Sequence, residues 1–194
     1  MRAFLLSCMA GGLALGAVAC TRAQPPIPLQ PIATIKDIMD GTVDPSADVI
    51  WQSVETVVSA AGTEDKQPRT DEEWKNVRNN ANRVIEATNL IMMEGRKVAK
   101  PGEKSANPGV ELQPEEIEAA INGDKATFFS RAIALRVASV KALEAIDKRD
   151  AQGLIDAGEQ MDTACENCHL KYWYPNGGPP KDAAPAAPLG KSGN

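Results

Sequence analysis

Aromatic residues are scarce in this sequence, at 4% of 194 residues, and runs rich in valine, threonine and tyrosine are few. Sheet proteins are normally enriched in both, so this shortage argues against a β fold. Lysine and arginine total 21 against 26 aspartate and glutamate residues, and the net charge of −5 leaves no basic excess to neutralise phosphates. The composition therefore favours a single all-α domain of ordinary size and argues against nucleic acid as a partner.

Histidine occurs once, at position 169, and cysteine four times, at positions 8, 20, 165 and 168. A structural zinc site needs four ligands, and beyond the N-terminal region the chain offers only one histidine and two cysteines. A thioredoxin-like dithiol normally lies beside a βαβ pattern, whereas the sequence around Cys165 is helical. These shortages disfavour both a zinc site and a redox dithiol at Cys165-Glu166-Asn167-Cys168-His169.

The same five residues fit covalent attachment of a haem. On a helix, Cys165, Cys168 and His169 project from one face, because they are three and four residues apart. Two thiols at this spacing, followed directly by an imidazole, are typical of c-type haem attachment. The thiols form thioethers with the vinyl groups of the porphyrin, and the imidazole becomes the proximal iron ligand. The motif therefore predicts one haem c, bound through Cys165 and Cys168 and ligated by His169.

Residues 1–19 predict a secretory signal peptide, with one basic residue, an apolar centre too short to span a membrane comfortably and small residues before Cys20. Ala17-Val18-Ala19-Cys20 resembles a bacterial lipobox, in which a lipid-modified cysteine becomes the new N-terminus; ordinary signal peptidase cleavage also fits Ala17 and Ala19. We favour a lipoprotein, because Cys20 would otherwise be an unpaired thiol in an oxidising compartment. The expected location is the periplasm of a Gram-negative-type bacterium, with a membrane anchor at Cys20.

The rest of the chain predicts a proline-rich tether over residues 20–31, a helical domain over 32–174 and a disordered Pro/Ala/Gly tail over 175–194. Helix-start signals and apolar spacing place four helices in the domain. The first helix is expected from Ile32 to Asp40 and, after a break at Gly41, from Asp44 to Ala60. The second should run from Asp71 to about Val98 and the third from Lys125 to Arg149. The last should begin after Asp150. A polar connection over Glu64 to Arg69 and a small helix beginning at Pro114 lie between them.

Two apolar stripes indicate which helix faces are buried. In the last helix the stripe includes both haem-attachment cysteines: Leu154, Gly158, Met161, Cys165, Cys168 and Tyr172. In the helix before it, three- and four-residue steps predict an inward face made of Phe129, Ile133, Val137, Val140, Leu143 and Ile146. The haem is therefore expected to lie inside the domain. Trp51 and Trp74 are interpreted as packing anchors.

This pattern of helices with a C-terminal Cys-x-x-Cys-His motif resembles cytochrome c′ and its low-spin relatives, the class II c-type cytochromes, over about Ile32 to Tyr174. The resemblance implies an antiparallel four-helix bundle that packs its haem between helices. In that family the motif continues His-x-x-Tyr followed by Arg or Lys, and here Tyr172 matches while Trp173 replaces the basic residue. That base contacts a haem propionate in the family, and Lys171 is the nearest substitute in the sequence.

The sixth iron ligand is the main open question. A second histidine does not exist, so the candidates are methionine, lysine or an open position. The resembling family supplies the residue over the distal face from the first helix, where Met39 stands in this chain. Met161 lies two turns before His169 on the same helix and is interpreted as core, as are Met92 and Met93. Met39 as a sixth ligand and Met39 as a core residue both stay open.

A Met39–His169 pair would make the protein a periplasmic electron carrier that exchanges electrons with a redox partner protein. An open sixth position would instead make it a five-coordinate haem protein that binds nitric oxide or carbon monoxide. A peroxidase needs distal acid–base groups, normally including histidine, so we do not expect an enzyme. Dimers are common in the resembling family, and for this chain both a monomer and a homodimer stay open.

Overall fold

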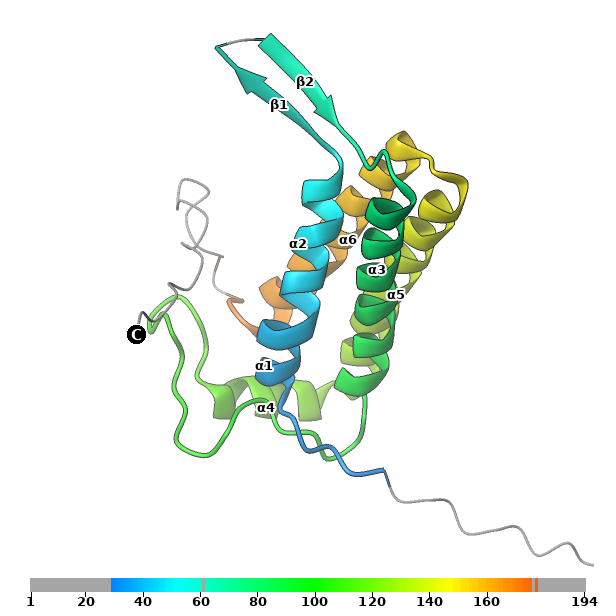
Figure 1. The fold of residues 1–194 in the computed structure, drawn as a ribbon. Helices are drawn as coiled ribbons and strands as arrows, with labels where there is room; N and C mark the ends of the chain where they lie inside the picture. Colours follow the sequence, from blue (N-terminus) through cyan, green and yellow to red (C-terminus); the bar gives the residue numbers. More distant parts are fainter. Residues whose placement is uncertain (1–28, 61, 176, 178–194) are drawn as a thin grey trace, which may run out of the picture.

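The computed structural model describes residues 29–60, 62–175 and 177, and this part of the chain is mostly helical (Figure 1). The all-α class predicted from the composition is therefore confirmed. The predicted signal peptide, Cys8 and Cys20, and most of the predicted tether and tail lie outside the described residues. In chain order the elements are α1 (Ile35–Ile38), the π-helical turn η1 (Met39–Val43), α2 (Asp44–Ser53), β1 (Glu55–Ser59), β2 (Gly62–Lys66), α3 (Asp71–Ile91), α4 (Pro114–Gly123), α5 (Lys125–Lys148) and α6 (Ala151–Tyr172).

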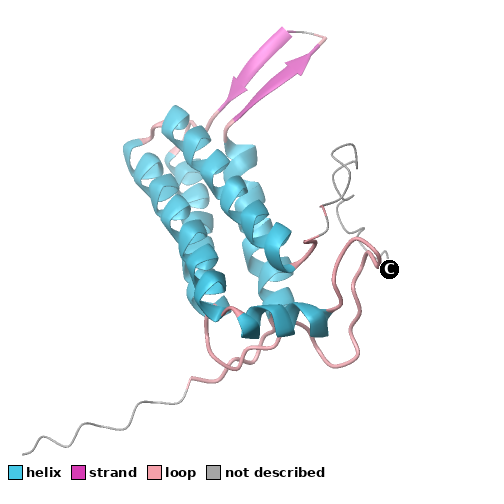
Figure 2. Ribbon diagram, turned by 180° about the vertical axis from the view of Figure 1, so that it is seen from behind, coloured by secondary structure: helices cyan, strands magenta, loops and turns pink. Residues whose placement is uncertain are grey.

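Four helices lie side by side and alternate in direction: α2 and α5 run one way, and α3 and α6 run the other way (Figures 1 and 2). Helix α5 packs against both α6 and α3, and α2 packs against α3 and α6. The short helix α4 crosses one end of this group, where it contacts α5 and α6. Within the described residues, no helix has the length and apolar character needed to span a membrane.

The first helix is continuous, so the predicted break at Gly41 is wrong. The π-helical turn η1 joins α1 to α2, and the backbone N–H of Asp44 donates to the carbonyl of Met39, five residues back. Pro45 explains this geometry, because it has no N–H to donate and its ring would clash with the carbonyl four residues earlier in a regular α-helix. A wider turn at this point accommodates proline without ending the helix.

The helix predicted up to Ala60 ends at Ser53, and a β-hairpin follows. Strands β1 and β2 pair antiparallel from Glu55 opposite Lys66 to Ser59 opposite Gly62, so part of the expected polar connection is also a strand. The reason is local: β1 contains consecutive β-branched residues, which favour extended backbone, and Gly62 adopts a φ of +130°. The hairpin projects beyond the end of the helices (Figure 1).

Three predicted helix starts are confirmed, whereas the first helix, expected from Ile32, begins at Ile35. Thr70 and Glu73 form a capping box at the start of α3, Asp124 accepts a hydrogen bond from the Thr127 N–H at the start of α5, and Asp150 accepts one from the Gly153 N–H at the start of α6. The expected end of the second helix near Val98 is wrong, because α3 ends at Ile91.

The inward face predicted for α5 is only partly correct: Phe129 and Leu143 are half-buried and pack against the core clusters, but three other residues do not. Ile133, Val137 and Val140 are 42%, 51% and 38% exposed, whereas Ile146 is buried as expected. The buried face is formed mainly by small residues, together with one phenylalanine and one leucine: Phe128, Ala132, Leu135, Ala138, Ser139, Ala142 and Ala145. Alanine and serine allow the backbone of α5 to approach α3 and α6 closely, so the helix is rotated away from its more hydrophobic stripe.

Buried side chains form two clusters. The larger one lies between α2, α3, α5 and α6 and includes Trp74, which is 7% exposed and acts as the packing anchor that the sequence predicts. The smaller one lies where α4 meets the ends of α1, α5 and α6, and it includes Ile117, Phe128 and Tyr172. The Phe128 and Tyr172 rings meet edge to face at 5.5 Å. Met39 packs against both clusters, so it lies at their junction.

Candidate functional site

Helix α6 carries the motif residues on its last two turns. Asp150 caps its first turn, and Leu154, Ala157 and Met161 bury its inner face, which fixes the rotation of the helix. Cys165, Cys168 and His169 follow on the same side and are half-buried. The two cysteines form no disulfide with each other or with any other described residue. The stripe predicted for α6 therefore correctly places the motif at the edge of the core.

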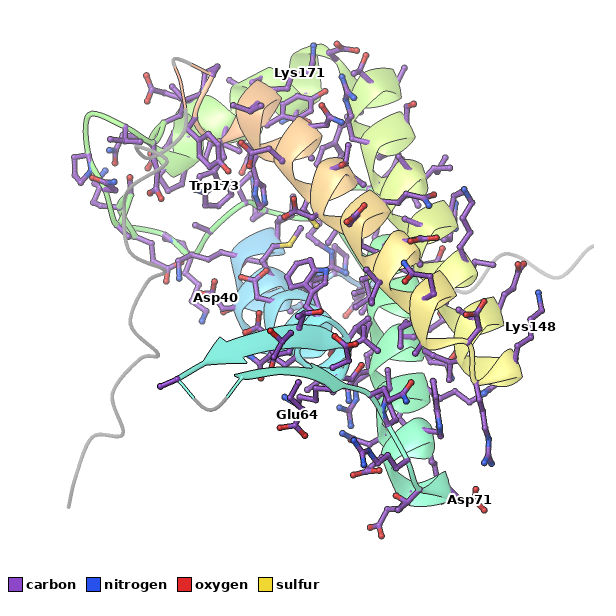
Figure 3. The ribbon with its side chains drawn as sticks, turned by 90° about the horizontal axis from the view of Figure 1, so that it is seen from above. Asp40, Glu64, Asp71, Lys148, Lys171 and Trp173 are labelled. Carbon is purple, nitrogen blue, oxygen red and sulfur yellow. The ribbon has the colours of Figure 1, made fainter. Side chains whose placement is uncertain are left out.

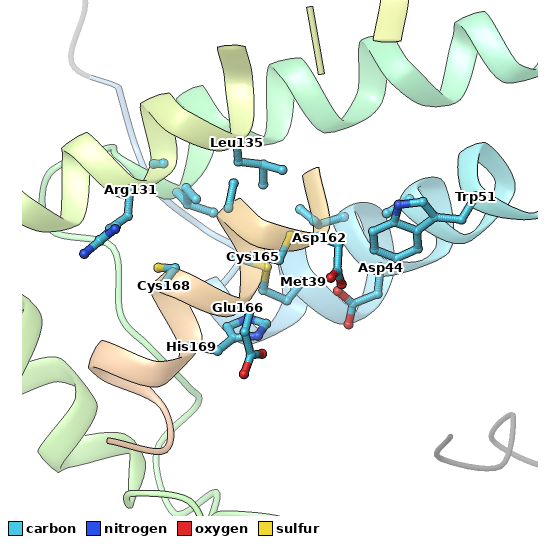
Figure 4. A pocket seen from close by; sticks show the side chains of 15 residues that line it. Met39, Asp44, Trp51, Arg131, Leu135, Asp162, Cys165, Glu166, Cys168 and His169 are labelled. Carbon is cyan, nitrogen blue, oxygen red and sulfur yellow. The ribbon is translucent and has the colours of Figure 1, made fainter. Parts of the chain in front are cut away.

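All three motif side chains line one cavity of about 190 Å³, which opens to solvent (Figure 4). Residues from the η1–α2 segment, α3, α5 and α6 surround it. The uncharged lining comes mostly from Met39, Val43, Ala47, Ile91, Ala132 and Leu135.

Burial keeps the motif groups uncharged near neutral pH. Loss of solvent raises the pKa of the Cys165 thiol to about 12 and that of the Cys168 thiol to about 11. The same cause lowers the pKa of the His169 imidazole. Neutral imidazole has a free nitrogen lone pair, which is the form that ligates a metal.

The side of the cavity near Cys165 is acidic. Asp44, Asp162 and Glu166 line it, and the Glu166 carboxylate accepts a hydrogen bond from the Tyr174 hydroxyl at 2.8 Å. Burial, with repulsion from neighbouring carboxylates, raises the pKa of Asp44 to about 6. Negative charge is therefore already costly on this side of the cavity.

Arg131 of α5 lines the other side, beyond Cys168, and was not predicted from the sequence (Figure 4). Its Nε atom is buried, and it has no hydrogen-bond partner in the described part of the chain. The incorrect inward face assigned to α5 placed Arg131 away from the core. With the observed rotation, Arg131 lies on the inner side of α5, between the buried residues Phe128 and Leu135. An arginine isolated on an otherwise apolar helix face is the sequence signal that would have identified it as a site residue.

Met39 lies in η1 and lines the same cavity as His169, although 130 residues of sequence separate them. π-Helical turns are rare and often occur at functional sites. The other methionines do not line the cavity: Met161 is fully buried, Met92 packs on the larger cluster, and the Met93 sulfur accepts a hydrogen bond from Arg96 at 3.1 Å. Among the described methionines, the fold therefore brings only Met39 to the site.

Lys171 and Trp173 lie at the C-terminal end of α6, far from Lys148, which ends α5 (Figure 3). The Lys171 ammonium forms an ion pair with Asp124 at 3.1 Å and lies 5.6 Å from the centre of the Tyr172 ring, so it does not line the cavity. Trp173 packs against the smaller cluster, with its ring 6.4 Å from that of His169. Lys171 therefore does not contribute a positive charge to the lining of the cavity.

Trp51 closes another part of the wall, and its indole Nε1–H donates to the Gly158 carbonyl at 3.0 Å. A Cβ at position 158 would lie 3.1 Å from the Trp51 ring, so glycine permits this close contact. Trp51 is therefore both a packing residue, as predicted, and a wall of the site.

No group of three or more His, Cys, Asp or Glu side chains is placed to hold a metal ion within the described residues. In the described part of the chain, the two thiols and the imidazole therefore do not form a protein-only metal site. Comparison of the chain with protein-family models, with curated proteins and with solved structures found no match.

Proposed function

We propose that this protein is an exported monohaem c-type cytochrome and that it carries electrons. In this proposal the helices form an antiparallel four-helix bundle, with haem c attached at Cys165 and Cys168. One observation carries the proposal: the side chains of the Cys-x-x-Cys-His motif and of Met39, which is distant from them in sequence, line the same mostly apolar cavity.

The residues present fit a haem in three respects. The mostly apolar lining of the cavity matches the body of a porphyrin. Two thiols for the thioethers and an imidazole for the iron lie on consecutive turns of one helix. The buried, unpartnered Nε of Arg131 matches the acidic groups that a porphyrin carries.

When bound, haem c supplies an iron that alternates between the ferrous and ferric states. Cys165 and Cys168 fix the cofactor to α6, and His169 ligates the metal from that helix. Met39 offers its thioether from the η1 turn, and a methionine ligand raises the reduction potential relative to a second histidine. Val43, Ala47 and Leu135 restrict access of water to the site.

The test is the absorption spectrum of the purified holoprotein, oxidised and reduced, with and without carbon monoxide. We expect covalently bound haem and a low-spin spectrum that does not change with carbon monoxide. Met39→Ala should give a high-spin, carbon monoxide-reactive protein with a lower reduction potential. Met92→Ala is the matched control, because Met92 packs on the core without lining the cavity, and it should keep the low-spin spectrum.

A gas-binding protein is the second candidate, and the apolar side chains of Val43, Ala47 and Leu135 favour it. Such a wall would suit nitric oxide or carbon monoxide if Met39 left the sixth position open. A high-spin wild-type spectrum with rapid carbon monoxide binding would reject the electron carrier and support this alternative.

Export to the periplasm and a lipid anchor at Cys20 are part of the same proposal, supported by the sequence of residues 1–20. Partition of the mature protein into the detergent phase and a lipid increment in its intact mass would support the anchor. An aqueous, unmodified protein would reject it.

A further inference from the structure

The cavity contains one side chain whose charge and position the ligation of iron does not use. We propose that Arg131 binds a propionate carboxylate of the haem and so fixes the orientation of the cofactor in the cavity. This inference rests on the function proposed above and assigns a role that the sequence motif does not.

Arg131 presents a hydrogen-bond donor that the described residues leave without an acceptor. Arg131 lies on α5, one helix away from the attachment motif, and its Nε atom is buried without a hydrogen-bond partner in the described residues. A buried charged donor without an acceptor is costly, and such groups normally have a partner. A carboxylate suits the planar, multi-donor guanidinium particularly well, because it can accept two parallel hydrogen bonds.

Charge is distributed unevenly around the cavity, with several carboxylates and one guanidinium in its lining. Asp44, Asp162 and Glu166 line it and repel a carboxylate, and Asp44 and Asp162 lie beyond Cys165 (Figure 4). Arg131 lies on the opposite side, beyond Cys168 (Figure 4). A cofactor that is apolar in its body and anionic at one edge would therefore direct that edge toward Arg131.

The neighbouring cationic side chains on α5 and α6 have other partners and do not line the cavity. Among the described residues that line the cavity, Arg131 is the only lysine or arginine. Lys171 is paired with Asp124, so it is not available in place of the basic residue that Trp173 replaces. Arg136, on the same helix as Arg131, donates to the Asn89 side chain at 2.6 Å and does not line the cavity.

The test compares Arg131→Gln with Arg136→Gln in the holoprotein, with Arg131→Lys and Arg131→Met as further variants. Arg131→Met keeps most of the apolar stem, so it distinguishes loss of packing from loss of charge. The measurements are haem content per chain, the midpoint potential, and the propionate bending bands in the resonance Raman spectrum. The haem content should be unchanged in every variant, because the thioethers hold the cofactor.

The midpoint potential should fall in Arg131→Gln and Arg131→Met, because a positive charge near the iron disfavours the oxidised state and its removal favours that state. The propionate bending bands should shift in the same variants. Arg131→Lys should keep most of the potential while still shifting the bands, because it retains the charge without the paired donors. Arg136→Gln should change neither property.

Unchanged propionate bands in Arg131→Gln, or an equal fall in potential in Arg136→Gln, would overturn this proposal while leaving the cytochrome function intact. Absence of covalent haem from the wild-type protein would instead reject the proposed function itself. Haem content of the wild type therefore separates the two failures.

Discussion

Asp37 shows how a single carboxylate fixes the start of the helix that carries Met39. Its side chain accepts hydrogen bonds from the Thr34 N–H at 3.0 Å and from the Lys100 ammonium at 2.7 Å. The first of these belongs to a capping box, since Thr34 in turn accepts from the Asp37 N–H. The second ties the long connection before α4 to α1. The same carboxylate thus stabilises a local cap and a contact between distant segments.

These contacts give a prediction for the pH dependence of stability. The hydrogen bond from Lys100, followed by those from Thr34, lowers the pKa of Asp37 from 3.8 to about 2. A carboxylate with a lowered pKa in the folded state contributes stability above its unfolded pKa, and that contribution disappears as the pH falls through the folded pKa. Asp37→Asn should therefore destabilise the protein by a constant amount above about pH 5, and the difference should shrink between about pH 4 and pH 2.

The measurement is urea unfolding of the holoprotein and of Asp37→Asn at a series of pH values. Lys100→Met is the companion variant, because it removes the largest cause of the pKa shift and leaves the capping box in place. It should show a smaller pH-dependent difference over the same range. A difference between wild type and Asp37→Asn that stays constant down to pH 2 would contradict the assignment.

At the scale of the element, the π-helical turn η1 sets the rotation of α1 relative to α2. One residue of a regular helix corresponds to about 100° of rotation. The additional residue in η1 lets Ile35 and Ile38 of α1 and Ile50 of α2 all face the core, and it brings Met39 to the cavity. The turn is therefore a structural requirement for the proposed sixth ligand.

Deletion of Gly41 tests this requirement. Removal of one residue should convert η1 to regular helix and rotate α1 by about 100°, so that Ile35 and Ile38 can no longer be buried. With about 1.5–3 kcal/mol for each buried isoleucine, the loss of stability should reach several kcal/mol. The deletion should also remove Met39 from the site and give a high-spin spectrum. Thermal unfolding and absorption spectra of the holoprotein provide the two readouts.

Gly41→Ala is the matched control, because it keeps the number of residues, and a Cβ at this position would meet no atom within 4 Å. It should keep the wild-type spectrum and gain up to about 1 kcal/mol of helix propensity. A deletion variant with wild-type stability and a low-spin spectrum would show that the turn does not control the position of Met39.

Local signals were the part of the fold that the sequence predicted well. Thr70, Asp124 and Asp150 cap their helices because each cap needs only a side chain and the next three residues. The rotation of α5 was wrong because it depends on partners: Ala132, Ala138 and Ala142 are individually weak hydrophobic signals, yet they allow the closest packing against neighbouring helices. Ile133 and Val137 form the stronger stripe and remain at the surface.

At the scale of the whole molecule, the candidate site is assembled from segments distant in sequence. The motif predicts Cys165, Cys168 and His169 by itself, since their relation is set within one helix. Met39 was predicted as a candidate iron ligand only through the family resemblance. Arg131 was missed because the sequence pattern predicted the wrong rotation for α5. The polarity of the cavity is a tertiary property, so no stretch of sequence contains it.

The cavity lies within the packing of the helices, so its contents should matter for stability. A void left by lost buried atoms costs about 24 cal/mol per Å³, and a residual void of only about 150 Å³ would cost about 4 kcal/mol. The cavity has a volume of about 190 Å³ and opens to solvent at its mouth. The chain without the proposed haem should therefore be less stable and partly collapsed around the site.

The double variant Cys165→Ser/Cys168→Ser tests this expectation, because it removes both attachment points. Purified without haem, it should retain helical circular dichroism, unfold at a lower temperature and unfold less cooperatively than the holoprotein. Cys165→Ser alone keeps one attachment point and should lie between the two, since the cofactor still fills the cavity. Equal unfolding temperatures for the double variant and the wild-type holoprotein would mean that the cavity closes fully by itself and that the cofactor is not a structural part of the helix packing.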